Sequence, residues 1–257
     1  LNRPERRNAF DECLATELCD SFEELGQDPS TRVMILAGAG PVFCAGADLR
    51  WMNPALPVSE AQAREDAHRL VRMYRAIDEC LPPVIGRVHG PAFGGGVGLM
   101  AVCDIVVAAE DASFALSEAR LGLIPAIISP FLLRKAGESF LRRYCLTSEA
   151  FSAPEAKHFN LVHDTTSPDG LDKRVQELCD MILRLAPQAT RQTKSLLRHM
   201  HFQTEGHHSV MCMDANVQAR LSEEAKEGLR AFMEKRPPAW TREASSLHAE
   251  SSNATDQ

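Results

Sequence analysis

Several features that would assign a protein to a common class are missing from these 257 residues. No stretch reaches the roughly 18 consecutive apolar residues that a membrane-spanning helix needs. There is no G-x-x-x-x-G-K-[ST] phosphate loop, and the glycines of "GAGPVFCAG" have the wrong spacing for G-x-G-x-x-G. No local motif suggests a Ser/His/Asp set. We therefore expect no membrane span and no phosphate-loop nucleotide site.

Charge and cysteine usage narrow the class further. The formal net charge of -7 argues against a nucleic-acid partner, although a local Arg/Lys cluster could still hold an anionic ligand. None of the 8 cysteines belongs to a C-x-x-C pair, so we expect free, mostly buried thiols in a reducing compartment and no metal site. These properties favour a cytoplasmic protein. The chain starts at Leu1 in what reads as mid-element, so we expect a short missing N-terminal piece, which leaves a mitochondrial address open.

The first half of the chain alternates strands with helices. We expect a helix that Asn8 caps and that runs to about Gly26, then a buried strand in "VMILAG". A second helix is expected over 59–80, with Ser59 as its N-cap and Gln62 in support. Two further strands are predicted in "PPVIGRVHG" and "CDIVVAAE". This alternation predicts an α/β architecture.

After Ser129 the pattern changes to successive helices with short connections. Ser152 and Glu155 form a capping-box pattern, which predicts a helix start. Further helices are expected over 169–185, 188–200 and 207–235. We expect a core over 1–188, a helical region over 189–243, and a tail over 244–257 whose composition is typical of disorder.

Two glycine-rich turns, each after an apolar strand, carry the main chemical signal. They are "FCAGADL" at 43–49 and "GGGVG" at 94–98. Glycine costs about 0.5–1 kcal/mol relative to alanine inside regular structure, so three in succession indicate a need for bare backbone. The N–H groups at a helix start have no partner within the helix, and two of them together can form an oxyanion hole. Tight packing of a strand against a helix would also explain such glycines.

These residues resemble the crotonase (enoyl-CoA hydratase/isomerase) superfamily. The motifs "FCAGADL", "GPAFGGGVGL", "CDIVVAAEDASFALSEARLGLIP" and "RAFMEKRPPAW" follow one another in the order of that family, and the similarity runs from "LNRPERRNAF" to about Trp240. The resemblance implies a core built as a spiral of β-β-α turns, with a C-terminal helical region that takes part in trimerisation. It also implies an acyl-CoA thioester as substrate, an enolate-type intermediate, and a homotrimer or a dimer of trimers. Coenzyme A would be part of the substrate, with no separate cofactor.

Carried over by position, the resemblance implies that the backbone amides of Ala47 and Gly95 hold the thioester oxygen. Glu118, in "LSEARLG", would be the acid/base residue. Its apolar neighbours predict a desolvated carboxyl with a raised pKa. The family's other glutamate is absent, because Gly98 occupies its place. This departure puts the usual two-glutamate hydration mechanism in doubt, and we identify no second base.

Several reactions remain compatible with a single glutamate. The segment "PAIISPFLL" at 125–133 resembles bacterial hydratases of methylglutaconyl-CoA, so we place an enoyl-CoA hydratase first. The alternatives are a double-bond isomerase that uses Glu118 alone, another acyl-CoA lyase, and a non-catalytic member that binds acyl-CoA or RNA.

The resemblance also implies contacts with coenzyme A. A carboxylated acyl group would need a nearby cation, for which the helix over 59–80 offers Arg64, His68, Arg69 and Arg72, although a solvated charged face is the plainer explanation. We expect His89 and Asp104 to be structural, and His207 and His208 to be exposed. The expected substrate-binding residues are Arg6, Arg7, Ala45, Asp48, Leu49, Gly94, Gly98, Phe232 and Lys235.

Overall fold

The computed structural model describes residues 1–51, 59–201, 213–219 and 222–241. The chain forms two compact units, the first made of Leu1–Cys80 with Val84–Gln176 and the second of Leu81–Pro83 with Glu177–Gln257. This division falls before the boundary expected at residue 188, and the expected tail over 244–257 lies outside the described residues. Among the described residues, no helix combines the length and apolar character that a bilayer crossing requires.

A four-stranded parallel sheet forms the centre of the first unit. Its strands are arranged in the order β1-β2-β4-β7, and each neighbouring pair is parallel. The side chains of β2 and β4 are almost entirely buried, which is typical of parallel strands covered on both faces. The strands are β1 (Met34–Ala37), β2 (Val84–Val88), β4 (Ile105–Ala109) and β7 (Asp164–Thr166).

A smaller sheet accompanies it, with the order β3-β5-β6. Strand β3 (Ala92–Phe93) pairs in parallel with β5 (Ser113–Ala115), and β6 (Ala150–Ser152) runs antiparallel to β5. An isolated parallel bridge between Cys44 and Ala92 continues this sheet on the other side of β3. Each of three successive turns of chain therefore passes through the larger sheet and then the smaller one before it enters a helix.

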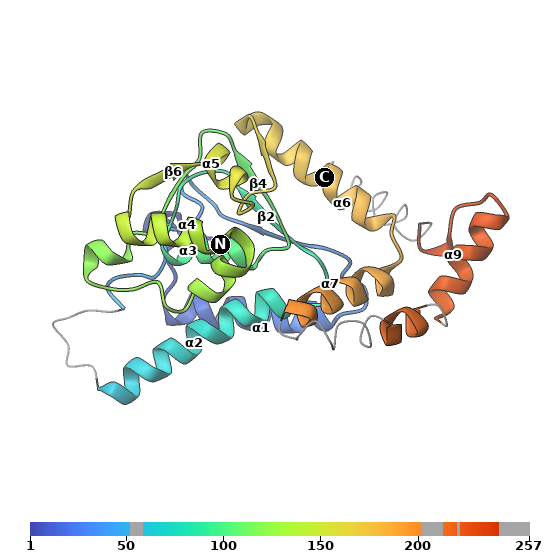
Figure 1. Ribbon diagram of the computed structural model, residues 1–257, viewed down its shortest axis with the longest axis horizontal. Helices are drawn as coiled ribbons and strands as arrows, with labels where there is room; N and C mark the ends of the chain where they lie inside the picture. The colour runs from blue at the N-terminus through green and yellow to red at the C-terminus, as the bar shows by residue number, and fades with distance from the viewer. Residues whose placement is uncertain (52–58, 202–212, 220–221, 242–257) are drawn as a thin grey trace, which may run out of the picture. The chain divides into compact units, whose positions relative to one another are not determined.

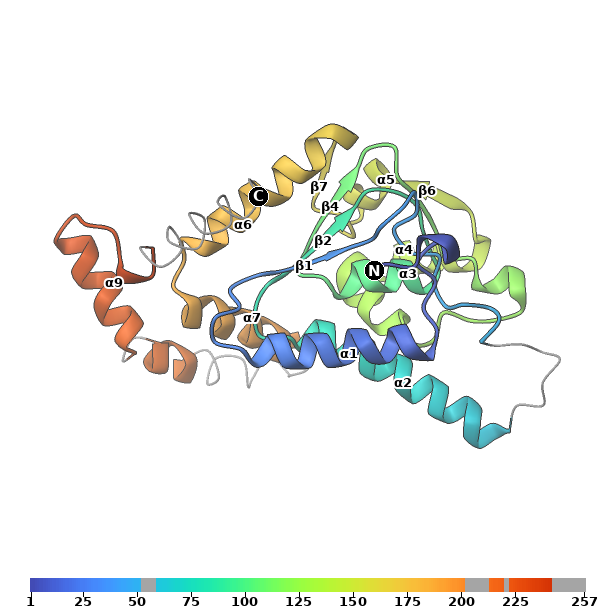
Figure 2. The same cartoon turned by 180° about the vertical axis from the view of Figure 1, so that it is seen from behind.

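Helices cover these sheets. Helices α1 and α2 lie side by side, as both views show (Figures 1 and 2). The core between helices and sheets is apolar and includes Phe10, Tyr74 and Leu99. The helices of this unit are η1 (Pro4–Arg6), α1 (Glu12–Gln27), α2 (Glu60–Glu79), α3 (Gly95–Val102), η2 (Glu118–Leu121), α4 (Ser129–Thr147), α5 (Ala153–His158) and η3 (Pro168–Gly170), and α6 (Leu171–Leu183) crosses into the second unit.

The predicted helix caps differ in outcome. Ser59 caps α2 by accepting a hydrogen bond from the Gln62 N–H at 3.1 Å, and Ser152 forms a complete capping box with Glu155 at α5. Both predictions are confirmed. The prediction for Asn8 is wrong, because Asp11 caps α1 and accepts from the Leu14 N–H.

Asn8 instead ties two loops together. Its backbone has φ 54°, and its buried side-chain amide donates to the carbonyl oxygens of Ala39 and Val42 at 2.8 Å each. Its side-chain oxygen accepts from the Arg3 N–H at 2.9 Å. These long-range contacts hold the first turns of the chain next to the loop that follows β1.

The second unit is helical in its described part. It contains α7 (Pro187–His201), a helical stretch at 213–219 and α9 (Glu223–Met233). The prediction of one continuous helix to residue 235 is wrong, because Ser222 has extended backbone (φ -67°, ψ 154°) and caps α9 through the Ala225 N–H. The beginning of that predicted helix, at 207–212, lies outside the described residues.

Candidate active site

The three residues expected to act on the substrate line one cavity. Cys44, Ala92 and Phe114 are in register across the smaller sheet, because Cys44 bridges Ala92 and Ala92 pairs with Phe114. Parallel strands end at the same edge of a sheet, so the residues that follow them meet there. In this way Ala47, Gly95 and Glu118 come together in a cavity of about 530 Å³, here called the Glu118 cavity.

Ala47 lies in a loop with constrained backbone. The Phe10 N–H donates to the Gly46 carbonyl and the Asp48 N–H donates to the Phe10 carbonyl, both at 2.9 Å. In such a parallel bridge the intervening residue turns its own N–H and C=O to the other side, and the Ala47 amide is therefore directed away from Phe10. Ala47 also lines the Glu118 cavity, where a free N–H can bind an oxyanion.

Gly46 allows the two glycine turns to touch. It has φ +85°, and a Cβ at this position would lie 2.8 Å from the Phe93 carbonyl oxygen and 3.1 Å from the Gly95 nitrogen. Real Cβ atoms do not come that close to backbone, so only glycine fits. The contact brings the loop of Ala47 directly against the start of α3.

Gly95 is the first residue of α3, and no side chain caps this helix. The first N–H groups of a helix lack intrahelical partners, and the helix dipole adds partial positive charge at that end. The glycine triplet also reflects close packing: a Cβ on Gly95 would lie 2.5 Å from Phe10 Cζ, and one on Gly96 would lie 2.3 Å from the Cys44 carbonyl oxygen. Packing therefore explains part of the glycine requirement that we attribute in the sequence to substrate approach.

Glu118 begins η2, three residues after the end of β5 at Ala115. Its side chain reaches Gly94, where a Cβ would lie 3.0 Å from Glu118 Oε1. The other carboxyl oxygen, Oε2, is buried without a hydrogen-bond partner among the described residues. Burial raises the pKa of the Glu118 carboxyl above its usual range, while its own backbone N–H opposes that shift. A raised pKa suits a group that must both take and return a proton.

Protein atoms fill the place where a side chain on residue 98 would lie. A Cβ on Gly98 would lie 2.3 Å from Ile128 Cγ2 and 3.0 Å from Tyr74 Cε1. Ile128 comes from the segment just before α4, and Tyr74 comes from α2. A glutamate at 98 is thus sterically excluded unless Ile128 moves, and Glu118 and Asp66 are the carboxyl groups among the described lining residues.

The walls of the Glu118 cavity are largely apolar. One wall comes from α2 and the other from the segment that follows Glu118. The Tyr74 hydroxyl donates to the Gly95 carbonyl at 2.8 Å, which fixes the first turn of α3, and burial raises the pKa of Tyr74 well above its usual value. The remaining lining residues include Leu49, Trp51, Ala63, Asp66, Ala67, Leu70, Leu121, Leu123, Ile124, Pro125, Ala126 and Ile127.

The expected substrate-binding residues are distributed over three places. Ala45, Leu49 and Gly94 line the Glu118 cavity, whereas Gly98 is buried inside α3. Asp48 lines a neighbouring depression with Asp11 and Thr16.

Arg6 and Arg7 are exposed, and the Arg7 carbonyl accepts from the Ala45 N–H at 2.9 Å, so this basic pair adjoins the cavity loop. Phe232 and Lys235 belong to the second unit, and Phe232 is 82% exposed. The roles of all these residues stay predictions.

The basic residues Arg64, His68, Arg69 and Arg72 of α2 do not line the Glu118 cavity, and the three arginines pair with nearby carboxylates. Arg64 pairs with Glu60 at 3.0 Å, Arg69 with Glu12 at 3.1 Å, and Arg72 with Glu23 at 2.7 Å. His68 is exposed as well. The plainer explanation therefore applies to this group, which forms a charged surface. The cavity side of the same helix contributes Asp66 and apolar residues.

The other histidines and Asp104 have structural or undescribed positions. Asp104, where α3 leads into β4, accepts from the N–H of Val84 at the start of β2 at 2.7 Å, so its hydrogen bond joins two neighbouring strands. His89 Nε2 lies 2.7 Å from the Gly40 carbonyl oxygen. His207 and His208 lie outside the described residues. The cysteines of the described chain are free, as expected, and burial raises the pKa of Cys44 to about 12.

Comparisons with known proteins identify the family of the chain. The family model for enoyl-CoA hydratase/isomerase matches residues 1–243. An enoyl-CoA hydratase of Alternaria alternata is 32% identical over 96% of this chain and 82% of its own. A mitochondrial Δ(3,5)-Δ(2,4)-dienoyl-CoA isomerase of Dictyostelium discoideum is 30% identical over 93% of this chain and 85% of its own.

A solved structure gives the same result at the level of the fold. The crystal structure of an enoyl-CoA hydratase from Shewanella pealeana superposes with a TM-score of 0.87 at 38% identity, covering 93% of this chain and 89% of that one. Ala47, Gly95 and Glu118 thus line one cavity of a chain whose relatives include proteins named enoyl-CoA hydratase and dienoyl-CoA isomerase. The protein belongs to the enoyl-CoA hydratase/isomerase family of the crotonase superfamily and has its α/β fold.

Proposed function

We propose that this enzyme hydrates the double bond of an α,β-unsaturated acyl-CoA. The amides of Ala47 and Gly95 bind the thioester oxygen, and Glu118 moves the proton. The single observation that carries the proposal is the position of Glu118: a carboxyl with a raised pKa and an unpartnered oxygen, in the cavity that both amides line. Several relatives are named hydratases, which supports hydration as the reaction.

One carboxyl is sufficient for both proton transfers. The Glu118 carboxylate removes a proton from water while the water oxygen bonds to C3. The electron pair of the double bond moves toward the thioester carbonyl, whose oxygen becomes negative and is held by the two amides. The Glu118 carboxyl then returns the same proton to C2 as the carbonyl re-forms, so water is added in full and Glu118 ends as it began.

A double-bond isomerase is the second candidate, and the position of Ile128 favours it. Ile128 occupies the space that a glutamate side chain on residue 98 would need, so the cavity has less polar surface there to hold a water molecule. In that reaction Glu118 would remove a proton from C2 of a 3-enoyl group and return it to C4. The dienoyl-CoA isomerase relative is consistent with such chemistry.

The acyl group is the next question. The described lining of the Glu118 cavity contains Asp66 and Glu118 as its charged residues and no Lys, Arg or His. A free carboxylate such as that of 3-methylglutaconyl-CoA would find no opposite charge among these residues, and burying it unpaired is costly. We therefore place neutral enoyl groups before 3-methylglutaconyl-CoA, with coenzyme A as part of the substrate and no resident cofactor.

Assembly and location belong to the same proposal. We expect a homotrimer or a dimer of trimers, to be checked by light scattering after gel filtration. The free thiols of the described chain support a cytoplasmic location.

The test is a panel of enoyl-CoA thioesters with products identified by mass. Hydration adds one water, isomerisation leaves the mass unchanged and shifts the double bond, and a binding-only protein returns the substrate. Glu118→Gln should lower the hydration rate by about 10²–10⁴-fold. The exposed Glu138→Gln, whose partner is Arg142 on the same helix, serves as the matched control and should keep the full rate.

The pH dependence gives a second readout. Hydration needs the Glu118 carboxylate, so its rate should fall as the pH drops through the raised pKa of that group, with a midpoint above the usual range of a glutamate. Full activity in Glu118→Gln, or turnover of no enoyl-CoA at all, would refute the proposed function.

A further inference from the structure

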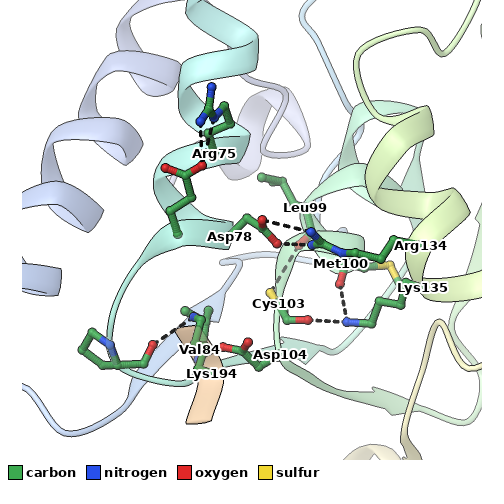
Figure 3. Close-up of polar contacts among 12 residues, drawn as sticks. Arg75, Asp78, Val84, Leu99, Met100, Cys103, Asp104, Arg134, Lys135 and Lys194 are labelled. Atoms are coloured by element: carbon green, nitrogen blue, oxygen red, sulfur yellow. Dashed lines mark hydrogen bonds and ion pairs between the residues drawn. The ribbon is translucent and has the colours of Figure 1, made fainter. Parts of the chain in front are cut away.

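The far end of α3 is held by a lysine from another helix. Lys135 of α4 directs its ammonium group onto the Met100 carbonyl at 3.3 Å and onto the Cys103 carbonyl, as Figure 3 shows. These carbonyls belong to the last turn of α3 and to its C-cap residue. The Met100 carbonyl also accepts from the Cys103 N–H at 3.3 Å, and Lys135 adds a charged donor at this end of α3, opposite Gly95.

The acidic residues near this ammonium are engaged elsewhere. Asp78 of α2 forms an ion pair with Arg134, the residue beside Lys135 (Figure 3). Asp104 accepts from the Val84 N–H at 2.7 Å. In the described part of the chain no carboxylate forms an ion pair with Lys135, so its positive charge is directed at the carbonyl end of α3.

A buried ammonium at this place needs an explanation. Removing it from water lowers the pKa of Lys135 to about 8, so the charged form is disfavoured relative to a solvated lysine. An uncharged residue with a polar tip could satisfy the same carbonyls without that desolvation. Hydrogen bonding to these carbonyls therefore does not require a positive charge. The charge lies at the C-terminal end of α3, where it can act on the electrostatic potential along the helix.

We infer that Lys135 is a positioning residue for the oxyanion site: it fixes the C-terminus of α3 and adds positive potential along the helix to the Gly95 amide. This inference rests on the proposed function. Helix α3 is about 12 Å long, and the hydrogen bonds at its two ends add about 3 Å each, so the ammonium lies about 18 Å from the oxyanion. At that distance, with an effective dielectric constant of about 20, one unit charge changes a rate by about fivefold.

The charge of Lys135 makes the effect depend on pH. Below a pH of about 8 the ammonium is charged and supports the oxyanion, and above it this support is lost. The charged or titratable groups that face it are Cys103 and Asp104 after α3, Arg134 on its own helix, Asp78 on α2, and His163 before β7. Burial, together with the Lys135 charge, lowers the pKa of His163 to about 4, so His163 stays neutral throughout this range.

The experiment compares the wild-type enzyme with Lys135→Met between pH 6.5 and 9.5, on the best substrate of the enoyl-CoA panel. Methionine keeps most of the side-chain volume and removes the charge. We expect the kcat of the variant to be about fivefold lower at pH 7 with little change in KM, because the charge acts on the transition state. The wild-type kcat should fall by the same factor around pH 8 and reach the level of the variant, whose own profile should be flat there. The exposed Lys157→Met is the matched control and should keep the wild-type profile.

The possible outcomes separate this inference from the proposed function. A variant within twofold of wild type at pH 7, or one that retains the fall near pH 8, overturns the role of Lys135 while hydration itself stands. Absence of turnover by the wild-type enzyme refutes the proposed function instead. If Lys135→Met does not fold, the wild-type profile decides alone: no fall in kcat around pH 8 overturns the inference.

Discussion

At the scale of single residues, Gly98 and Ile128 meet beside the Glu118 cavity, and a side chain on residue 98 would occupy the space that Ile128 fills. Gly98 leaves the room into which Ile128 packs, so the missing carboxyl and the bulky neighbour are two aspects of one arrangement. The absence of a second glutamate is visible in the sequence. Its compensation by Ile128 and Tyr74 is not, because these residues are distant in sequence from residue 98 and meet it only in the folded chain.

Glutamate at position 98 tests this pairing. Gly98→Glu forces its Cβ into Ile128 Cγ2, which lies 2.3 Å away, so we expect a loss of about 1–3 kcal/mol in the free energy of unfolding. The double variant Gly98→Glu with Ile128→Ala removes the 2.3 Å contact with Ile128 Cγ2 and should be more stable than the two separate losses together predict. Urea denaturation of the four proteins measures this coupling, and simple additivity would contradict the shared volume.

At the scale of elements, the site depends on contact between two turns of chain. The loop before Ala47 touches the start of α3 through Gly46, and the Tyr74 hydroxyl holds the Gly95 carbonyl from α2. Backbone packing and the Tyr74 hydroxyl thus hold the turn of Ala47 against the start of α3.

Alanine at position 46 should separate the two amides. The new Cβ would press on the Phe93 carbonyl and the Gly95 nitrogen, and φ +85° adds strain. We expect kcat to fall by at least about 10²-fold, the effect of losing one oxyanion donor. Gly137→Ala provides the matched control: its φ is +83°, but no atom lies within 4 Å of the new Cβ, so it should lose stability and keep kcat. Equal losses of kcat in both variants would contradict a local effect on the amides.

Helix caps are predictable from the sequence where the capping hydrogen bond joins residues close together in the chain. The caps at Ser59 and Ser152 were predictable because each bonds to a residue three positions later. Asn8 has an equally good capping side chain, but its hydrogen bonds to distant loop carbonyls determine its place. Strands β3 and β6 are too short for a periodic signal and exist because neighbouring turns stack against them.

At the scale of the whole molecule, the negative net charge of the protein should repel the expected ligand, an acyl-CoA. The chain has a formal charge of -7, and the phosphates of coenzyme A are also negative. Local cations must therefore offset this repulsion. Arg6 and Arg7 are exposed beside the loop of Ala45 and are the candidates in the first unit.

Neutralising this basic pair should weaken binding and leave the chemistry intact. For Arg6→Gln with Arg7→Gln we expect KM for acyl-CoA to rise by about five- to tenfold with unchanged kcat, because the lost attraction is the same in ground and transition state. Added salt should raise the wild-type KM more steeply than that of the variant. The control pair Arg64→Gln with Arg142→Gln removes two exposed arginines that already have carboxylate partners and should leave KM unchanged. An unchanged KM in the first variant would remove Arg6 and Arg7 from the binding of coenzyme A.

The α/β class was accessible from the alternation of strands and helices, and the family and the grouping of Ala47, Gly95 and Glu118 were accessible from the resemblance of the two glycine turns and "LSEARLG" to one family. The break of the last helices at Ser222 was not, since a single serine in a polar helical stretch has no distinctive pattern. Residues such as Lys135 were also missed, because their importance depends on which helix end they meet.

The two amides belong to the main chain, whereas the acid group is an ordinary side chain on a separate turn. Substitutions at 98, 118 and 128 thus change the group that acts on the acyl chain and leave in place the amides that bind the thioester oxygen. An ancestral protein with this layout could have moved from one reaction to another without first losing its hold on the substrate. The same separation is useful for redesign, because the reactive side chain can be varied while the two oxyanion-binding amides are kept.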